Sequence, residues 1–154
     1  MIPRFQVIPL PEHQAQFRVA GRERTRWHFG PQYPRPFFYP LLGGSGESLT
    51  RMGHPGDAGH DHHRSVWFAH HKVAGFDFWS EHGGTQIAQQ RWLCYSDGDE
   101  EAALAAELAW FDPDRRELLR QELVAAVRER QGSATIRPGE WLLELQATFT
   151  PAKG

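Results

Sequence analysis

Hydrophobic and polar residues alternate at both ends of the chain. In residues 14–20 the apolar side chains recur at every second position, and residues 22–29 repeat this alternation less regularly. Residues 141–150 show the cleanest alternation, starting at Trp141 and ending beside Phe149. A period of two is typical of a β-strand with one buried face. These segments therefore predict antiparallel strands rather than helices.

The middle of the chain combines prolines, turns and aromatic residues. The run RPFFYPLL at residues 35–42 is too rich in proline for a helix and suits an edge strand or an extended segment. Residues 65–73 predict a strand, residues 74–75 a tight turn and residues 76–79 a returning strand. Residues 85–95 predict a further strand. Long helices are not indicated anywhere in this part of the sequence.

Two segments near the C-terminal end fit more than one structure. Residues 100–110 and 115–130 are rich in Ala, Leu, Glu and Arg, and this composition favours helices. Apolar residues four positions apart support a helix in the second segment. Apolar residues on alternate positions also support a strand, although Gln121 interrupts their face. A turn signal at Asp112 separates the two segments, so local residues leave both alternatives open.

Composition narrows the class of protein. The 154 residues fit a single domain over 1–154, and 17 Lys and Arg against 19 Asp and Glu give a net charge of −2. Proteins that bind nucleic acids usually carry an excess of basic residues, so this charge balance does not indicate a nucleic-acid partner. No apolar run reaches the ~20 residues of a membrane span, and the N-terminus lacks the apolar core of a signal peptide. Cys94 is the one cysteine, which excludes a disulfide framework and favours a buried apolar role for it. We expect a cytoplasmic protein without a membrane partner.

Histidines gather in one short stretch. Six of them lie between His54 and His71, and the loop at residues 54–64 also holds two aspartates and Arg64. Imidazole is a common metal ligand and titrates near neutral pH, so such a loop can bind a divalent metal or transfer protons. His60 and His62 would share one side of an extended segment and supply two of the three protein ligands of a zinc site. The spacings of common zinc motifs are absent.

The loop and its aromatic neighbours supply the candidate site. Arg64 either contacts a ligand carboxylate or phosphate, or pairs with Asp57 or Asp61 to hold the loop. The nearby tryptophans either join the core or stack on a sugar ring. The candidate catalytic residues are His62, His63 and Arg64; the candidate substrate-binding residues are His54, Asp57, Asp61, Trp67, His70 and Trp79; and the candidate ligands of a divalent metal such as zinc are His60 and His62.

Three blocks resemble a known family. They are PFFYPL at Pro36–Leu41, HHRSVWFAH at His62–His70 and AGFDFW at Ala74–Trp79. In this order they resemble the PmoA-like family of bacterial proteins of unknown function. The resemblance implies a water-soluble antiparallel β-sandwich with little or no helix, and strands at residues 105–111, 117–128 and 140–150. Because family members are about twice as long, the resemblance also implies that the chain is the N-terminal part of a longer, partly truncated sandwich. It further implies that the ligand is related to a carbohydrate.

Two classes of function follow from these observations. The first is an enzyme that acts on a small carbohydrate or sugar-derived substrate through the His-rich loop. The second is a non-catalytic module that binds a glycan or forms part of a larger sandwich. The free edge expected beside the strand at residues 141–150 also predicts either a homodimer or a marginally stable, aggregation-prone chain, because unpaired strand edges associate with other chains.

Overall fold

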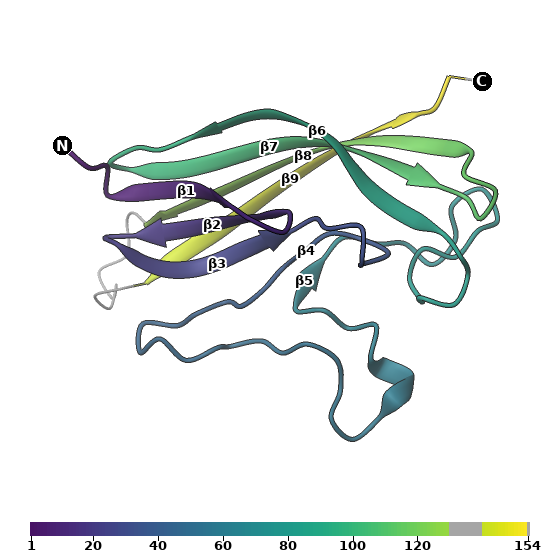
Figure 1. Ribbon diagram of the computed structural model, residues 1–154, viewed down its shortest axis with the longest axis horizontal. Coiled ribbons are helices and arrows are strands. Elements are labelled where there is room, and N and C mark those ends of the chain that lie inside the picture. Colours follow the sequence, from purple (N-terminus) through teal and green to yellow (C-terminus); the bar gives the residue numbers. More distant parts are fainter. Residues whose placement is uncertain (130–139, 154) are drawn as a thin grey trace.

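A computed structural model describes residues 1–129 and 140–153 and shows two antiparallel β-sheets packed on each other (Figure 1). The first sheet has the order β1-β2-β3-β4-β5, with strands Phe5–Leu10, Gln14–Val19, Arg22–His28, Phe37–Phe38 and Val66–Trp67. The second has the order β6-β7-β8-β9, with strands Gln86–Ser96, Glu101–Phe111, Glu117–Glu129 and Trp141–Pro151. A 3₁₀ turn, η1 at Ala58–His60, lies between β4 and β5. The predicted all-β sandwich is confirmed.

Strands β7 and β8 show why helix propensity fails in this chain. Large residues of one strand face small residues of the other, as in the pairs Leu104 with Ala125 and Leu123 with Ala106. All four side chains are buried. This large-to-small matching needs side chains at a period of two, and burial of that face outweighs the weak local preference for helix. The last residue of the predicted 115–130 segment lies outside the described residues.

The core lies between the two sheets. Phe5, Phe17 and Trp27 of the first sheet join Leu104 and Trp110 of the second in one buried cluster. Polar contacts also connect the sheets. The indole N–H of Trp27 donates to Gln89 Oε1 at 2.8 Å, and a β-bridge joins Phe5 to Gly98. The sheets therefore form one scaffold, from which the connection between β4 and β5 projects.

The predicted hairpin at residues 65–79 is mostly wrong. Strand β5 covers only Val66–Trp67, and the returning segment makes a single bridge between Val73 and Phe76. The predicted tight turn between these two residues is present. One further backbone bond joins the segments, from the Phe78 N–H to the His70 carbonyl at 3.1 Å, whereas the Lys72 N–H donates to the side chain of His70, at Nδ1, at 3.1 Å.

The prediction for Cys94 is also wrong, because this residue is exposed. It lies on β6, an edge strand of the second sheet. The register between β6 and β7 shifts between Trp92 and Cys94, as at a β-bulge. A bulge turns the following side chains relative to the pleat, so the sequence pattern does not report their burial.

Strand β9 confirms the predicted strand at residues 141–150 and leaves part of its apolar face open. Within the described residues β9 pairs only with β8. Leu145 and Phe149 lie on the side facing the core, yet 42% and 39% of their surfaces are exposed. The homodimer predicted from this edge stays a prediction. Among the described residues, no helix is long and apolar enough to cross a membrane.

Candidate functional site

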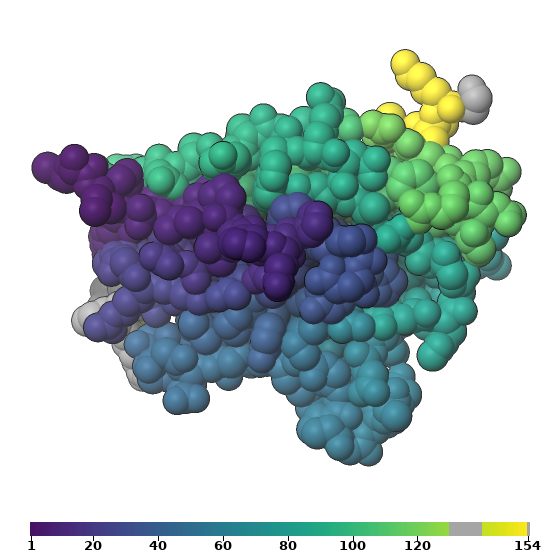
Figure 2. Space-filling view, viewed as in Figure 1, coloured from purple at the N-terminus to yellow at the C-terminus, as the bar shows by residue number. Residues whose placement is uncertain are grey.

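The His-rich loop is closed at its base and projects from the sandwich. A β-bridge joins Met52 to Arg64, and the Gly53 N–H donates to the carbonyl of His63 at 2.7 Å. The turn η1 forms part of the projecting segment, which Figure 2 shows in blue below the sheets. This closure brings the start and the end of the loop together, although they are ten residues apart in the sequence.

Asp57 organises η1 with both of its carboxylate oxygens. Its Oδ1 accepts from the Gly59 N–H at 3.0 Å, which caps the turn, and its Oδ2 lies 2.6 Å from His60 Nδ1. The hydrogen bond from His60, followed by that from Gly59, lowers the pKa of Asp57. With Nδ1 donating to the carboxylate, Nε2 is the ring nitrogen that this contact leaves available. A carboxylate that orients an imidazole in this way is the arrangement of a general base.

Four imidazoles crowd together at this loop. Ring centroids are 4.4 Å apart for His62 and His63, 5.0 Å for His60 and His63, and 5.9 Å for His54 and His60. Burial, followed by the positive charges that its neighbours would carry, lowers the pKa of His63 below 6.5. His63 is therefore neutral at pH 7 and able to accept a proton.

Two tryptophans lie beside the imidazoles. The rings of Trp67 and Trp79 have centroids 5.3 Å apart, and His63 stacks on Trp67 at 5.5 Å with an angle of 28°. Trp79 is 41% exposed. The Asp77 carboxylate holds it in a turn by accepting from the Trp79 N–H at 2.7 Å. The result is an exposed aromatic surface adjacent to the imidazoles.

An ion triad connects the two segments that carry these rings. Arg64 donates to both carboxylate oxygens of Glu81, at 2.7 and 2.8 Å, and Arg35 lies 3.7 Å from the same carboxylate. Arg64 follows His63 directly and Glu81 lies two residues after Trp79. The pair therefore fixes the imidazole cluster relative to Trp79. Burial alone would raise the pKa of Glu81, but the hydrogen bond from Arg64 and the charges of both arginines lower it overall.

The pairing of Arg64 corrects one interpretation of the sequence. Neither Asp57 nor Asp61 is its partner: Asp57 binds His60, and Asp61 Oδ1 accepts from the His54 N–H at 3.4 Å. Glu81 lies on a distant segment that the pattern of the loop does not report. Because two of its nitrogens already bind Glu81, Arg64 acts here as a positioning residue.

Most of the predicted site residues come together. Those in mutual contact through the loop and the aromatic surface are His54, Asp57, His60, His62, His63, Trp67 and Trp79. His70 makes no ring contact with this group among the described residues; its Nδ1 accepts from Lys72 instead. Arg35 and Glu81 were missed by sequence reasoning. The one hint of them in the sequence is that Arg35 and Glu81 lie at the two ends of the region that contains the three blocks.

The described residues contain no group of three or more His, Cys, Asp or Glu side chains placed to hold a metal ion. The predicted pair, His60 and His62, has ring centroids 6.3 Å apart. The segment before His60 is a 3₁₀ turn rather than an extended strand, and His60 Nδ1 is occupied by Asp57. The reasoning that placed both rings on one side of an extended segment therefore does not apply.

Comparisons with known proteins identify a family but no function. A model of the family of unknown function DUF6807 matches residues 14–154. Nothing in this match links the chain to PmoA, so the resemblance to PmoA-like proteins is corrected. A search of the curated proteins and a search of the solved structures gave no match. Since the family model covers nearly the whole sequence, the chain belongs to DUF6807, a family of unknown function.

Proposed function

We propose that this chain is an enzyme that acts on a carbohydrate or sugar-derived substrate at the surface formed by Trp79, Trp67 and the loop imidazoles. The observation that carries the proposal is the position of Trp79, whose exposed ring has its centroid 6.2 Å from those of both His62 and His63. The apolar C–H face of a sugar ring packs well on an aromatic ring, while its hydroxyl groups need polar partners nearby.

The imidazoles have separate roles in this proposal. His63, which is neutral at pH 7, accepts a proton from a substrate hydroxyl. His60, oriented by Asp57, is the second candidate base, and its side chain is half exposed to solvent. Arg64 and Glu81 hold the two segments in register and do not touch the substrate.

A non-catalytic glycan-binding module is the second candidate. One observation favours it, namely that the acidic groups around the loop are already engaged. Asp57 binds His60, Asp61 accepts from the His54 backbone and Glu81 binds Arg64. Most glycosidases use a pair of free carboxyl groups, which this arrangement does not offer.

Titration with a panel of neutral mono- and disaccharides, followed by NMR, tests the binding step. We expect at least one sugar to shift the indole N–H resonances of Trp79 and Trp67, and Trp79→Ala to abolish the effect. Trp92→Ala is the matched control, because Trp92 is a partly buried tryptophan that packs on Phe29 in another part of the molecule. If no sugar shifts these resonances, or if Trp92→Ala abolishes binding equally, the proposal is wrong.

Incubation with the bound sugar separates the two candidates. An enzyme converts the sugar over hours. His63→Gln, unlike His63→Ala, keeps a side chain that can hydrogen-bond the sugar but cannot take up a proton near neutral pH, so it stops the conversion while the sugar still binds. A binding module returns the sugar unchanged. Conversion that persists in both His63→Gln and His60→Asn would remove the imidazoles from the mechanism.

A further inference from the structure

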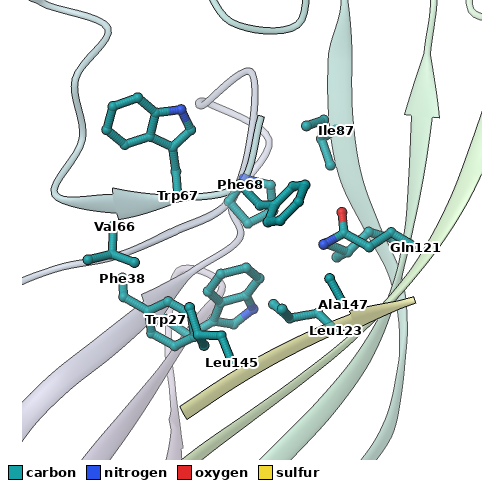
Figure 3. Close-up of a pocket in the computed structure, with 12 residues that line it drawn as sticks. Trp27, Phe38, Val66, Trp67, Phe68, Ile87, Gln121, Leu123, Leu145 and Ala147 are labelled. Atoms are coloured by element: carbon teal, nitrogen blue, oxygen red, sulfur yellow. The ribbon is translucent and has the colours of Figure 1, made fainter. Parts of the chain in front are cut away.

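A second site lies between the two sheets, on the inner side of Trp67. It is a cavity of about 90 Å³, and Figure 3 shows the residues around it. Trp27 and Phe38 line it from the first sheet, and Leu108 and Leu123 line it from the second. Among the residues that the structure describes, no charged side chain contributes to the lining. The cavity therefore suits an uncharged molecule.

Gln121 is the exception in this apolar lining. It is only 1% exposed, and it is the residue that interrupts the apolar face of β8. Its Oε1 accepts from the indole N–H of Trp110 at 2.9 Å. Because an indole nitrogen only donates, this bond fixes the amide orientation and leaves Nε2 as the free end. Nε2 has no partner among the described residues, and Figure 3 shows the amide nitrogen directed toward the space beside Phe68.

A buried N–H group without a partner is rare in folded proteins, and it points to a missing acceptor. Water is a poor candidate, since ordered buried waters take two to four polar partners, and within residues 1–129 and 140–153 Gln121 is the one polar side chain that lines the cavity besides the tryptophans. The indole N–H of Trp27 is already bound to Gln89. The indole N–H of Trp67 also lacks a partner among the described residues, but Figure 3 shows the Trp67 ring directed away from Gln121. A ligand that is apolar except for one hydrogen-bond acceptor would be a better partner for Gln121 Nε2 than water.

The cavity has an opening to solvent. Phe68 and Leu145 line it and are 48% and 42% exposed, so its mouth lies between the segment after β5 and the edge strand β9. The ring of Phe149 lies 5.1 Å from that of Phe68 and extends the apolar rim. A small molecule can enter here without separating the two sheets.

We propose that this cavity binds a small, uncharged, mainly apolar molecule with one carbonyl-type acceptor, which takes the free Gln121 N–H. Its volume is below the ~150 Å³ of an apolar cavity that holds benzene, so the buried part of the ligand has a single small ring or a short chain. The proposal does not rest on the proposed carbohydrate function. The two sites share Trp67, which lines the cavity and stacks on His63.

Cyclopentanone and cyclopentane are the probes that test this site. Their rings match in size, but only the ketone carries an acceptor. Side-chain amide resonances in ¹H–¹⁵N NMR spectra follow Gln121 directly, and ligand-observed NMR follows both probes. We expect cyclopentanone to shift the Gln121 amide resonance in a saturable way. In Gln121→Met, cyclopentanone should bind about tenfold more weakly, whereas the affinity for cyclopentane should hardly change.

Ala147→Leu is the second variant, because Ala147 lines the cavity and a larger side chain there fills it. It leaves Gln121 and its bond to Trp110 in place, and we expect it to abolish binding of both probes. The proposal is overturned if cyclopentanone gives no saturable shift in the wild type. It is also overturned if Gln121→Met weakens both probes equally, or if Ala147→Leu binds them as the wild type does.

Discussion

The second sheet and the connection between β4 and β5 are built in opposite ways. Strands β6 to β9 have 11, 11, 13 and 11 residues and pair with their sequence neighbours. Residues 39–65 contain only η1 and isolated bridges. The sheet follows from a repeated pattern of apolar side chains, whereas the connection depends on individual polar contacts such as those of Asp57 and Arg64. The scaffold and the site therefore have different sources of stability.

Replacement of a core leucine should give the largest effect. Leu104 is fully buried between the sheets, so Leu104→Ala removes apolar contacts and leaves a cavity, at a cost of about 2–5 kcal/mol of unfolding free energy. Urea denaturation measures this change. Leu93→Ala is the matched control on β6, where 37% of the side chain is exposed, and it should cost less than ~1 kcal/mol. Equal losses in both variants would mean that the sheet is not packed as described.

Glu81→Gln should give the next largest loss of stability, and it should loosen the connection between β4 and β5. Arg35 is 3% exposed, and the loss of the Glu81 charge leaves its guanidinium buried without an ionic partner. We expect a loss of about 2 kcal/mol, together with faster hydrogen exchange in the His-rich loop. The control is Glu107→Gln, whose partners Arg91 and Arg120 are exposed, and it should cost clearly less than Glu81→Gln because solvent screens these pairs.

The Glu81 contribution should depend on pH in a defined direction. Its pKa is lower in the folded protein than the ordinary value of 4.5, so the unfolded chain binds the proton more readily. The stabilisation is then complete above about pH 4.5 and is lost as the pH falls through the folded pKa. The difference in unfolding free energy between the wild type and Glu81→Gln should shrink in acid. A constant difference down to pH 3 would show that the charge of Glu81 is not the cause.

The contrast between the two regions explains what the sequence could predict. The alternation at residues 14–20 and 141–150 reports burial on one face, and both segments are strands as predicted. Residues 100–110 also suit a helix by composition, and only the matching of large and small side chains across β7 and β8 decides for strand. Such matching becomes visible once the partner strand is known. The sandwich could thus be predicted, but not from propensity alone.

The sequence predicted which types of residue form the site, but it predicted few of the contacts between them. The histidines were identified because six of them lie in one short stretch, and Trp79 because an aromatic side chain beside a polar loop can stack on a sugar ring. Glu81 was not, because its importance comes from Arg64, which lies 17 residues earlier in the chain. The extended geometry expected for the loop was wrong because Asp57 caps a 3₁₀ turn there. Long-range ionic contacts and local capping are therefore what the sequence pattern did not reveal.

Truncation of the loop imidazoles should affect stability little. His62 and His63 are half-buried residues of a projecting loop, and their removal leaves no cavity in the core. We expect His62→Ala and His63→Ala each to cost about 0.5 kcal/mol in urea denaturation and to abolish binding of the sugar ligand. A loss of several kcal/mol in either variant would show that these histidines support the fold instead.

The smallest expected effect is the dependence of stability on the protonation of His63. Burial and the neighbouring imidazoles lower its pKa below 6.5, so the folded protein holds the neutral ring while the unfolded chain takes up a proton first. Stability should therefore decrease as the pH falls from about 6.5 through the folded pKa, and this part of the decrease should be absent in His63→Gln. NMR titration of the imidazole C–H resonance gives the folded pKa directly. A midpoint at or above 6.5 would contradict the environment described for His63, and with it the assignment of its neutral ring as the proton acceptor.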